Sequence, residues 1–119
     1  MKCEKSQKCS IERIVDIIGS KWNLFIIWHL RARELRFTEL QAQMCSVNAK
    51  TITKHLRDLE NHGIILRKVF PEVPPRVEYS LTVGGKALLP VIGAMLEWGG
   101  KHLPPAGRYD DDCMKPENK

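Results

Sequence analysis

Apolar residues recur with a helical period through most of this chain, and the clearest case is the stretch NAKTITKHLRDLENHG at residues 48–63. Ile52, Leu56 and Leu59 are spaced by four and three, which places them on one stripe of a helix. Asn48 is suited to cap the first turn, and Gly63 to end the helix in a left-handed conformation. The opposite face is polar and basic: Ala49, Lys50, Thr53, Lys54 and Arg57. The pattern therefore predicts a helix with one buried face and one cationic face.

Three more helices are predicted before this one. An apolar stripe indicates a short first helix from Ile11 to Ile18, which Gly19 closes. The next helix, 21–30, is apolar almost all round, follows a capping Ser20, and is expected at the centre of the core. Phe37, Leu40 and Met44 mark a third helix that begins near Arg36 or Phe37. A tight connection at 45–48 joins it to the cationic helix, which makes a helix-turn-helix unit.

The period changes from 3.6 to 2 after Gly63. Apolar residues alternate at 64–69 and again at 77–81, on either side of the proline-rich turn 71–75. This is the pattern of a β-hairpin, and a hairpin directly after a helix-turn-helix predicts a winged helix. A last helix is expected over 83–101, capped by Thr82 and kinked at Pro90, which cannot donate a backbone hydrogen bond.

The first and last helices carry more apolar surface than one small domain can cover, which indicates a homodimer interface. The predicted interface residues are Ile11, Ile14, Val15, Ile18, Leu88, Ile92, Met95 and Leu96. The expected fold class is thus mainly α with a small β-hairpin: a winged helix-turn-helix that dimerises through its N- and C-terminal helices. One domain spans 11–103, between a flexible arm at 1–10 and a flexible polar tail at 104–119.

Composition adds a weak argument for an anionic partner. The 119-residue chain has a formal net charge of +5 and a pI near 9.2, and its basic residues concentrate around the cationic helix, whereas the tail holds three consecutive aspartates. No apolar run approaches the roughly 18 residues of a membrane span, and the N-terminus lacks a signal-peptide pattern. A cytoplasmic protein with no membrane partner is expected.

Several short strings together resemble the HxlR family of bacterial transcription regulators. They include Arg36-Phe37-Thr38-Glu39-Leu40, Leu56-Arg57-Asp58-Leu59-Glu60 and the run from Pro74 to Thr82, in the order and spacing of that family. The resemblance covers residues 9–100 and implies a dimeric winged helix, related in architecture to the MarR regulators, that binds pseudo-palindromic operator DNA as a repressor or activator. The family's usual Cys-Pro is Cys9-Ser10 here, and its Gly-Gly-Lys-Trp is Gly19-Ser20-Lys21-Trp22.

The DNA contacts follow from the predicted geometry. Ala49, Lys50, Thr53 and Lys54 are assigned to base edges in the major groove of double-stranded DNA, and Arg57 to phosphate. Further candidates lie outside this helix: Arg36 and Thr38 at a helix N-terminus that suits a phosphate, Arg76 beside the wing tip, and Lys68. Arg67 and Lys68 alternate along a strand, so at most one of the two points at DNA.

Cys9 is a candidate redox sensor, because helix amides and nearby basic residues favour a thiolate, and because members of the resembled family sense oxidants at this position. A small packing residue is the alternative. Two other functions remain open: a winged helix that binds proteins, and a receptor for a small-molecule effector in an aromatic pocket of Trp22, Phe25, Trp28 and Trp98. The four histidines and four cysteines show no metal-ligand spacing, and no catalytic motif is present. No cofactor, metal or enzymatic activity is expected.

Overall fold

The structure is a computed structural model that describes residues 10–104. Residues 1–9 and 105–119, which hold most of the predicted arm and tail, lie outside the described part of the chain. Along the chain the elements are α1 (Ser10–Ile18), α2 (Lys21–His29), β1 (Leu35–Arg36), α3 (Phe37–Gln43), α4 (Ala49–Asn61), β2 (Ile65–Phe70), β3 (Arg76–Leu81), α5 (Val83–Ala87) and α6 (Leu89–His102). This is the predicted winged helix-turn-helix class, mainly helical with a small antiparallel sheet.

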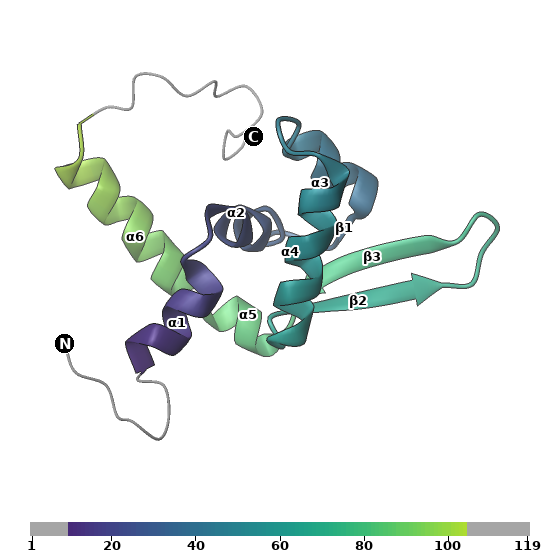
Figure 1. Cartoon of the computed structure of the whole chain (residues 1–119), viewed down its shortest axis with the longest axis horizontal. Coiled ribbons are helices and arrows are strands. Elements are labelled where there is room, and N and C mark those ends of the chain that lie inside the picture. Colours follow the sequence, from purple (N-terminus) through teal and green to yellow (C-terminus); the bar gives the residue numbers. More distant parts are fainter. Residues whose placement is uncertain (1–9, 105–119) are drawn as a thin grey trace.

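Helix α2 forms the centre of the molecule, as its apolar composition predicts. It contacts α1, α3, α4 and α6, and Ile26 and Ile27 are fully buried. In Figure 1, α1 and α6 lie on one side of α2, and the β2–β3 wing projects on the other. The surfaces predicted for dimerisation and the wing are therefore at opposite ends of the molecule.

The cationic helix α4 begins and ends where its capping residues predict. The Asn48 side chain accepts a hydrogen bond from the Thr51 amide at 2.8 Å, and Gly63 has φ of +74°. Ile52, Leu56 and Leu59 are buried in the core. At α3, Arg36 occupies the capping position and its amide donates to the Glu39 carboxylate at 2.8 Å, whereas Ser20 before α2 makes no side-chain cap.

The sheet has a strand that the sequence did not predict. Leu35 and Arg36 form β1, which pairs antiparallel with β3 through Leu35 opposite Tyr79 and Arg36 opposite Glu78. The order is β1-β3-β2, so β3 is central and the hairpin is the outer part of a three-stranded sheet. A two-residue strand is too short to show a period, and only its partner defines it.

The predicted single C-terminal helix is wrong in one respect: it is two helices, α5 and α6, that meet at Leu88. Pro90 is the second residue of α6, a position where its missing amide proton costs nothing. The chain therefore does not kink at Pro90 as predicted, but breaks between α5 and α6 at Leu88, two residues earlier. Thr82 caps α5 as predicted, because its hydroxyl accepts from the Gly85 amide at 3.0 Å.

Most of the predicted dimer residues are accessible. Ile11, Ile14 and Val15 on α1 and Met95 and Leu96 on α6 are exposed large hydrophobic residues. Ile18 and Leu88 are half-buried. Ile92 corrects the predicted set, because it is 4 % exposed and packs in the core of its own protomer. Ile92 lies on the face of α6 that packs against α2. The helical period marks this face as apolar but does not show whether it meets α2 or a second protomer.

Candidate nucleic-acid interface

The outer face of α4 is solvent-exposed and basic. Ala49, Lys50, Lys54 and Arg57 are exposed, and Thr53 is half-buried on the side toward the wing. An open groove of about 910 Å³ runs over this helix and is lined by Lys50, Lys54 and Arg57 among others. A helix held by a buried stripe, with cations on the opposite face, has the form that enters a major groove.

The wing adds one cation to this face that the predicted site omits. A hollow of about 380 Å³ between α4 and the sheet is lined by Thr53, Arg57, Arg67 and Tyr79, among others. Arg67 is paired with the buried Tyr79 in the strand register, so it lies on the α4 side of the sheet. Lys68 therefore points to the other face, where its ammonium nitrogen is 5.1 Å from the centre of the Phe70 ring. The period-two pattern that starts at the buried Ile65 is the signal that could have selected Arg67.

Arg76 is restrained by its own protomer. Its guanidinium lies 3.2 Å from the Glu72 carboxylate, 3.7 Å from the Glu78 carboxylate and 3.9 Å from the centre of the Phe70 ring. A phosphate would have to compete with two carboxylates for this side chain. The predicted role of Arg76 as a backbone or minor-groove contact thus requires these ion pairs to open.

Arg36 and Thr38 are both exposed at the start of α3, as the predicted phosphate contact requires. The first turn also holds Glu39, whose carboxylate accepts from the Arg36 amide and lies 3.5 Å from Arg33. The hydrogen bond from the Arg36 backbone is the main cause that lowers the pKa of Glu39, with the Arg33 side chain adding to it. This carboxylate is thus ionised at neutral pH and already neutralises part of the positive end of α3.

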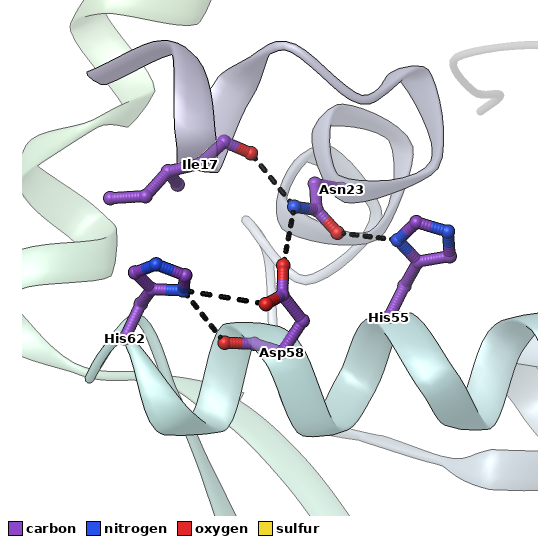
Figure 2. Close-up of polar contacts among 5 residues, drawn as sticks. All are labelled: Ile17, Asn23, His55, Asp58 and His62. Carbon is purple, nitrogen blue, oxygen red and sulfur yellow. Dashed lines mark hydrogen bonds and ion pairs between the residues drawn. The ribbon is translucent and has the colours of Figure 1, made fainter. Parts of the chain in front are cut away.

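The flank of α4 that faces α2 holds a polar cluster, shown in Figure 2. The buried Asn23 side chain of α2 contacts both His55 and Asp58 of α4. Burial is the main cause that lowers the pKa of His55, and the charge of Lys54 adds to it while Asp58 opposes it. Asn23 is not among the predicted site residues, although a polar residue in an otherwise apolar central helix is a signal for a required hydrogen-bond partner.

An apolar cleft of about 480 Å³ lies between α2 and α6, and Phe25, Trp28, His29 and Ile92 are among its lining residues. Of the predicted aromatic pocket, Phe25 and Trp28 line this cleft. Trp22 instead packs against Phe25 with ring centres 5.7 Å apart, and Trp98 is exposed and lies 5.1 Å from the His102 ring. Burial, and secondarily the charge of Arg31, lowers the pKa of His29.

Within residues 10–104, no three histidine, cysteine or acidic residues gather in a way that could hold a metal ion. No helix of the described part is long and apolar enough to cross a membrane. Cys9, the candidate redox residue, lies outside the described residues.

Comparison with known proteins identifies the family. The model of the HxlR-like helix-turn-helix family matches residues 17–106. This chain belongs to the HxlR-like helix-turn-helix family. An HTH-type transcriptional regulator of Methanothermobacter thermautotrophicus is 42% identical over 102 residues, which cover 83% of this chain and 78% of that protein.

Two solved structures support the same assignment. A MarR-family regulator from Porphyromonas gingivalis W83 superposes with a TM-score of 0.76 at 35% identity, over 87% of this chain and 100% of that one. The redox regulator HypR in its oxidised form has a TM-score of 0.75 at 38% identity, over 82% of this chain and 100% of that one. The protein is therefore a transcriptional regulator with a helix-turn-helix, not an enzyme, and its family implies DNA binding.

Proposed function

We propose that this HxlR-like protein is a homodimer that binds a pseudo-palindromic operator in cytoplasmic DNA, with α4 of each protomer in the major groove. The observation that carries the proposal is the geometry of α4. Its apolar stripe is fully buried, its ends are capped, and its outward face presents Lys50, Lys54 and Arg57 to solvent next to the wing. A rigid cationic helix of this kind positions base-reading side chains reproducibly.

Contacts divide by position on the helix. The N-terminal part of α4 reaches deepest into a groove, so the residues assigned to base edges are Ala49, Lys50, Thr53 and Lys54. The lysine ammonium groups can donate hydrogen bonds to guanine, and the methyl groups of alanine and threonine can contact the methyl group of thymine. Arg57, one turn further along, meets the phosphate backbone. Arg36, Thr38, Lys68 and Arg76 are additional backbone candidates. Arg67, which lines the same hollow as Arg57, is the alternative to Lys68 on the wing, because at most one of these two neighbours can point at DNA.

The dimer would form through the exposed apolar residues of α1 and α6. Val15 is 52 % exposed and Leu96 is 55 % exposed, which is high for large apolar side chains in a protein that works alone. A two-fold axis through these helices would point the two α4 helices at half-sites on one face of the duplex, about one or two helical turns apart.

Selection of bound duplexes from a random-sequence pool tests this function. The full chain is expected to enrich an inverted repeat, with affinity that falls steeply as salt rises, because counterions are released from the neutralised phosphates. Ile14→Glu in α1 is expected to weaken dimerisation and operator binding together. Enrichment of no motif, with no shift of any duplex at low salt, would instead favour a protein-binding winged helix.

Similarity to the redox regulator HypR supports the proposal that Cys9 regulates DNA binding in this protein. Diamide treatment of the wild-type protein is expected to lower operator affinity, and reduction is expected to restore it. The Cys9→Ser variant should bind with the same affinity before and after diamide. Unchanged wild-type affinity after complete thiol oxidation would exclude Cys9 as a sensor.

The cleft between α2 and α6 supports a second candidate, a small-molecule effector site. It is mostly apolar, and Trp28, whose indole nitrogen has no hydrogen-bond partner within residues 10–104, is among its lining residues. An apolar ligand with one acceptor atom suits such a cleft. A thermal-shift screen of small apolar aromatic compounds that carry one acceptor atom, compared between wild type and Gly100→Trp, tests it. A shift shared by both proteins, or none in either, would argue against this cleft.

A further inference from the structure

Asn23 is the one buried polar residue among residues 10–104, at 1 % exposed, and it joins three helices. Its amide nitrogen donates to the Ile17 carbonyl of α1 at 2.8 Å and to the Asp58 carboxylate of α4 at 3.2 Å. Its amide oxygen lies 2.9 Å from Nδ1 of His55, also on α4. Figure 2 shows the Asn23 side chain reaching these partners from α2, between α1 and α4. We call these four residues the Asn23 cluster.

The partners fix the orientation of the Asn23 amide. Its two N–H groups face two acceptors, a carbonyl and a carboxylate, so the amide oxygen faces His55. The reversed amide would place its oxygen against both acceptors. His55 must therefore carry a proton on Nδ1 to donate to that oxygen, in its neutral form as well as when charged. Asn23 is buried while His55 and Asp58 are half-buried, so these directional bonds form at the edge of the core, where water competes with them less than at the open surface.

This direction matters because apolar packing restrains the rotation of α4 about its own axis less sharply than a hydrogen bond does. Ile52, Leu56 and Leu59 hold the helix down, but such contacts are non-directional. His55 and Asp58 are three residues apart on the flank between the buried stripe and the cationic face. Two hydrogen bonds to one buried side chain at this flank therefore add a directional restraint on the way Lys50, Lys54 and Arg57 point.

The same side chain connects this orientation to α1. Ile17 is in the last turn of α1, where a carbonyl oxygen has no amide donor within the helix, and the Asn23 side chain supplies that donor. α1 carries the exposed residues Ile11, Ile14 and Val15, which are proposed to contact a second protomer. One amide thus links the helix of the proposed dimer contact to the helix that faces DNA.

We propose that Asn23 and His55 are positioning residues for operator recognition: their hydrogen bond sets the rotation of α4 relative to α1, and hence the register of its side chains on the bases. This inference rests on the proposed DNA-binding function. The bond contributes to the ratio of specific to non-specific affinity, because phosphate contacts tolerate a small rotation of the helix and bidentate base contacts do not.

Three substitutions of His55 separate this role from a direct DNA contact. The side-chain amide nitrogen of asparagine takes the place of Nδ1, whereas glutamine places its amide near the position of Nε2. His55→Asn keeps the donor to Asn23, His55→Gln keeps only the outward polar group, and His55→Leu removes both. Affinities of the full-length variants are measured for the selected operator duplex and for a scrambled duplex, with circular-dichroism melting to compare their stability.

The positioning role predicts that His55→Leu and His55→Gln lower the specificity ratio about tenfold or more, with little change on the scrambled duplex, and that His55→Asn restores most of it. Restoration by glutamine but not asparagine would show a direct DNA contact and overturn the proposal. An equal loss on both duplexes, or no loss in a folded His55→Leu protein, would overturn it as well. Absence of any sequence preference in the wild-type protein would instead overturn the proposed function itself.

Asn23→Leu provides the reciprocal measurement, provided that the protein still melts cooperatively. If the two residues act through one bond, the double variant Asn23→Leu/His55→Leu has the same specificity ratio as either single variant. A double variant whose fold-loss in specificity ratio equals the product of the two single-variant losses would show that the residues act independently and would contradict the proposal.

Discussion

Two glycines at the junction of α4, the wing and α5 should respond very differently to alanine. Gly63 needs its positive φ of 74°, but a Cβ built there would meet nothing within 4 Å. Gly85 has no such backbone requirement, but its Cβ would overlap the Ile64 carbonyl oxygen and approach a Leu81 methyl carbon at 3.2 Å. One substitution thus costs conformational strain, and the other costs a steric clash.

The expected sizes follow from these environments. Gly63→Ala should lower the free energy of unfolding by about 1 kcal/mol, the cost of holding one L-residue in the left-handed region. Gly85→Ala should lower it by about 3 kcal/mol, because the backbone must move away from Ile64. That movement also strains the Ile64 carbonyl, which accepts the Thr82 amide at 3.0 Å and the Thr82 hydroxyl at 3.1 Å.

Denaturant unfolding at one fixed protein concentration measures both values, since a dimer makes stability depend on concentration. Each kcal/mol should appear as a melting-temperature change of roughly 4 °C for a chain of this length. Gly63→Asn should be milder than Gly63→Ala, because asparagine tolerates the left-handed region. Gly93→Ala, in α6 with no atom near the new Cβ, serves as a control without loss. A greater loss of stability at Gly63 than at Gly85 would show that backbone strain outweighs the clash with Ile64 and would contradict this prediction.

Other predictions concern binding, assembly and pH. Lys54→Ala should cost about 1–3 kcal/mol of operator binding and change the preferred base, whereas Arg57→Ala should weaken all sequences alike; no effect of either would remove α4 from the interface. Val15→Glu should shift the proposed dimer to monomer in analytical ultracentrifugation, and an unchanged sedimentation coefficient would refute the proposed α1 contact. Burial lowers the pKa of His29 and of His55, so the unfolded chain binds more protons below about pH 6.5, the ordinary histidine value. The contribution of these neutral histidines to the free energy of unfolding should therefore be fully present above that pH and decrease as the pH falls from 7 toward 5. The decrease should be smaller in His29→Gln, and a rise in stability over this range would contradict the lowered histidine pKa values.

Local signals explain why much of the fold was predictable. The bounds of α4 depend on its own residues, since Asn48 and Gly63 act within one turn of their positions. The wing follows from a change of period, and Thr82 caps the next helix through a bond three residues away. Each of these features is encoded within a few residues of where it occurs.

What the sequence did not predict depends on partners far along the chain. Strand β1 exists because β3 pairs with Leu35 and Arg36, more than 40 residues later. Ile92 is buried because α6 packs on α2, and no local pattern distinguishes that face of α6 from one that meets a second protomer.

The candidate site shows the same division. The cationic face of α4 was evident from its helical period, whereas the place of Arg67 beside Arg57 depends on how the sheet packs on α4. The Asn23 cluster joins residues 32 and 35 positions apart, so only the folded chain reveals which groups satisfy the buried amide.

Hydroxyl-radical footprinting of the selected duplex shows whether paired α4 helices recognise an operator. We expect two protected windows of equal strength, centred about one or two helical turns apart on one face of the DNA, and loss of both windows at high salt. Methylation of guanine N7 in the major groove of each window should block binding if lysines of α4 contact those bases. A uniform footprint without windows, or binding that is insensitive to major-groove methylation, would contradict the claim that paired α4 helices recognise an operator.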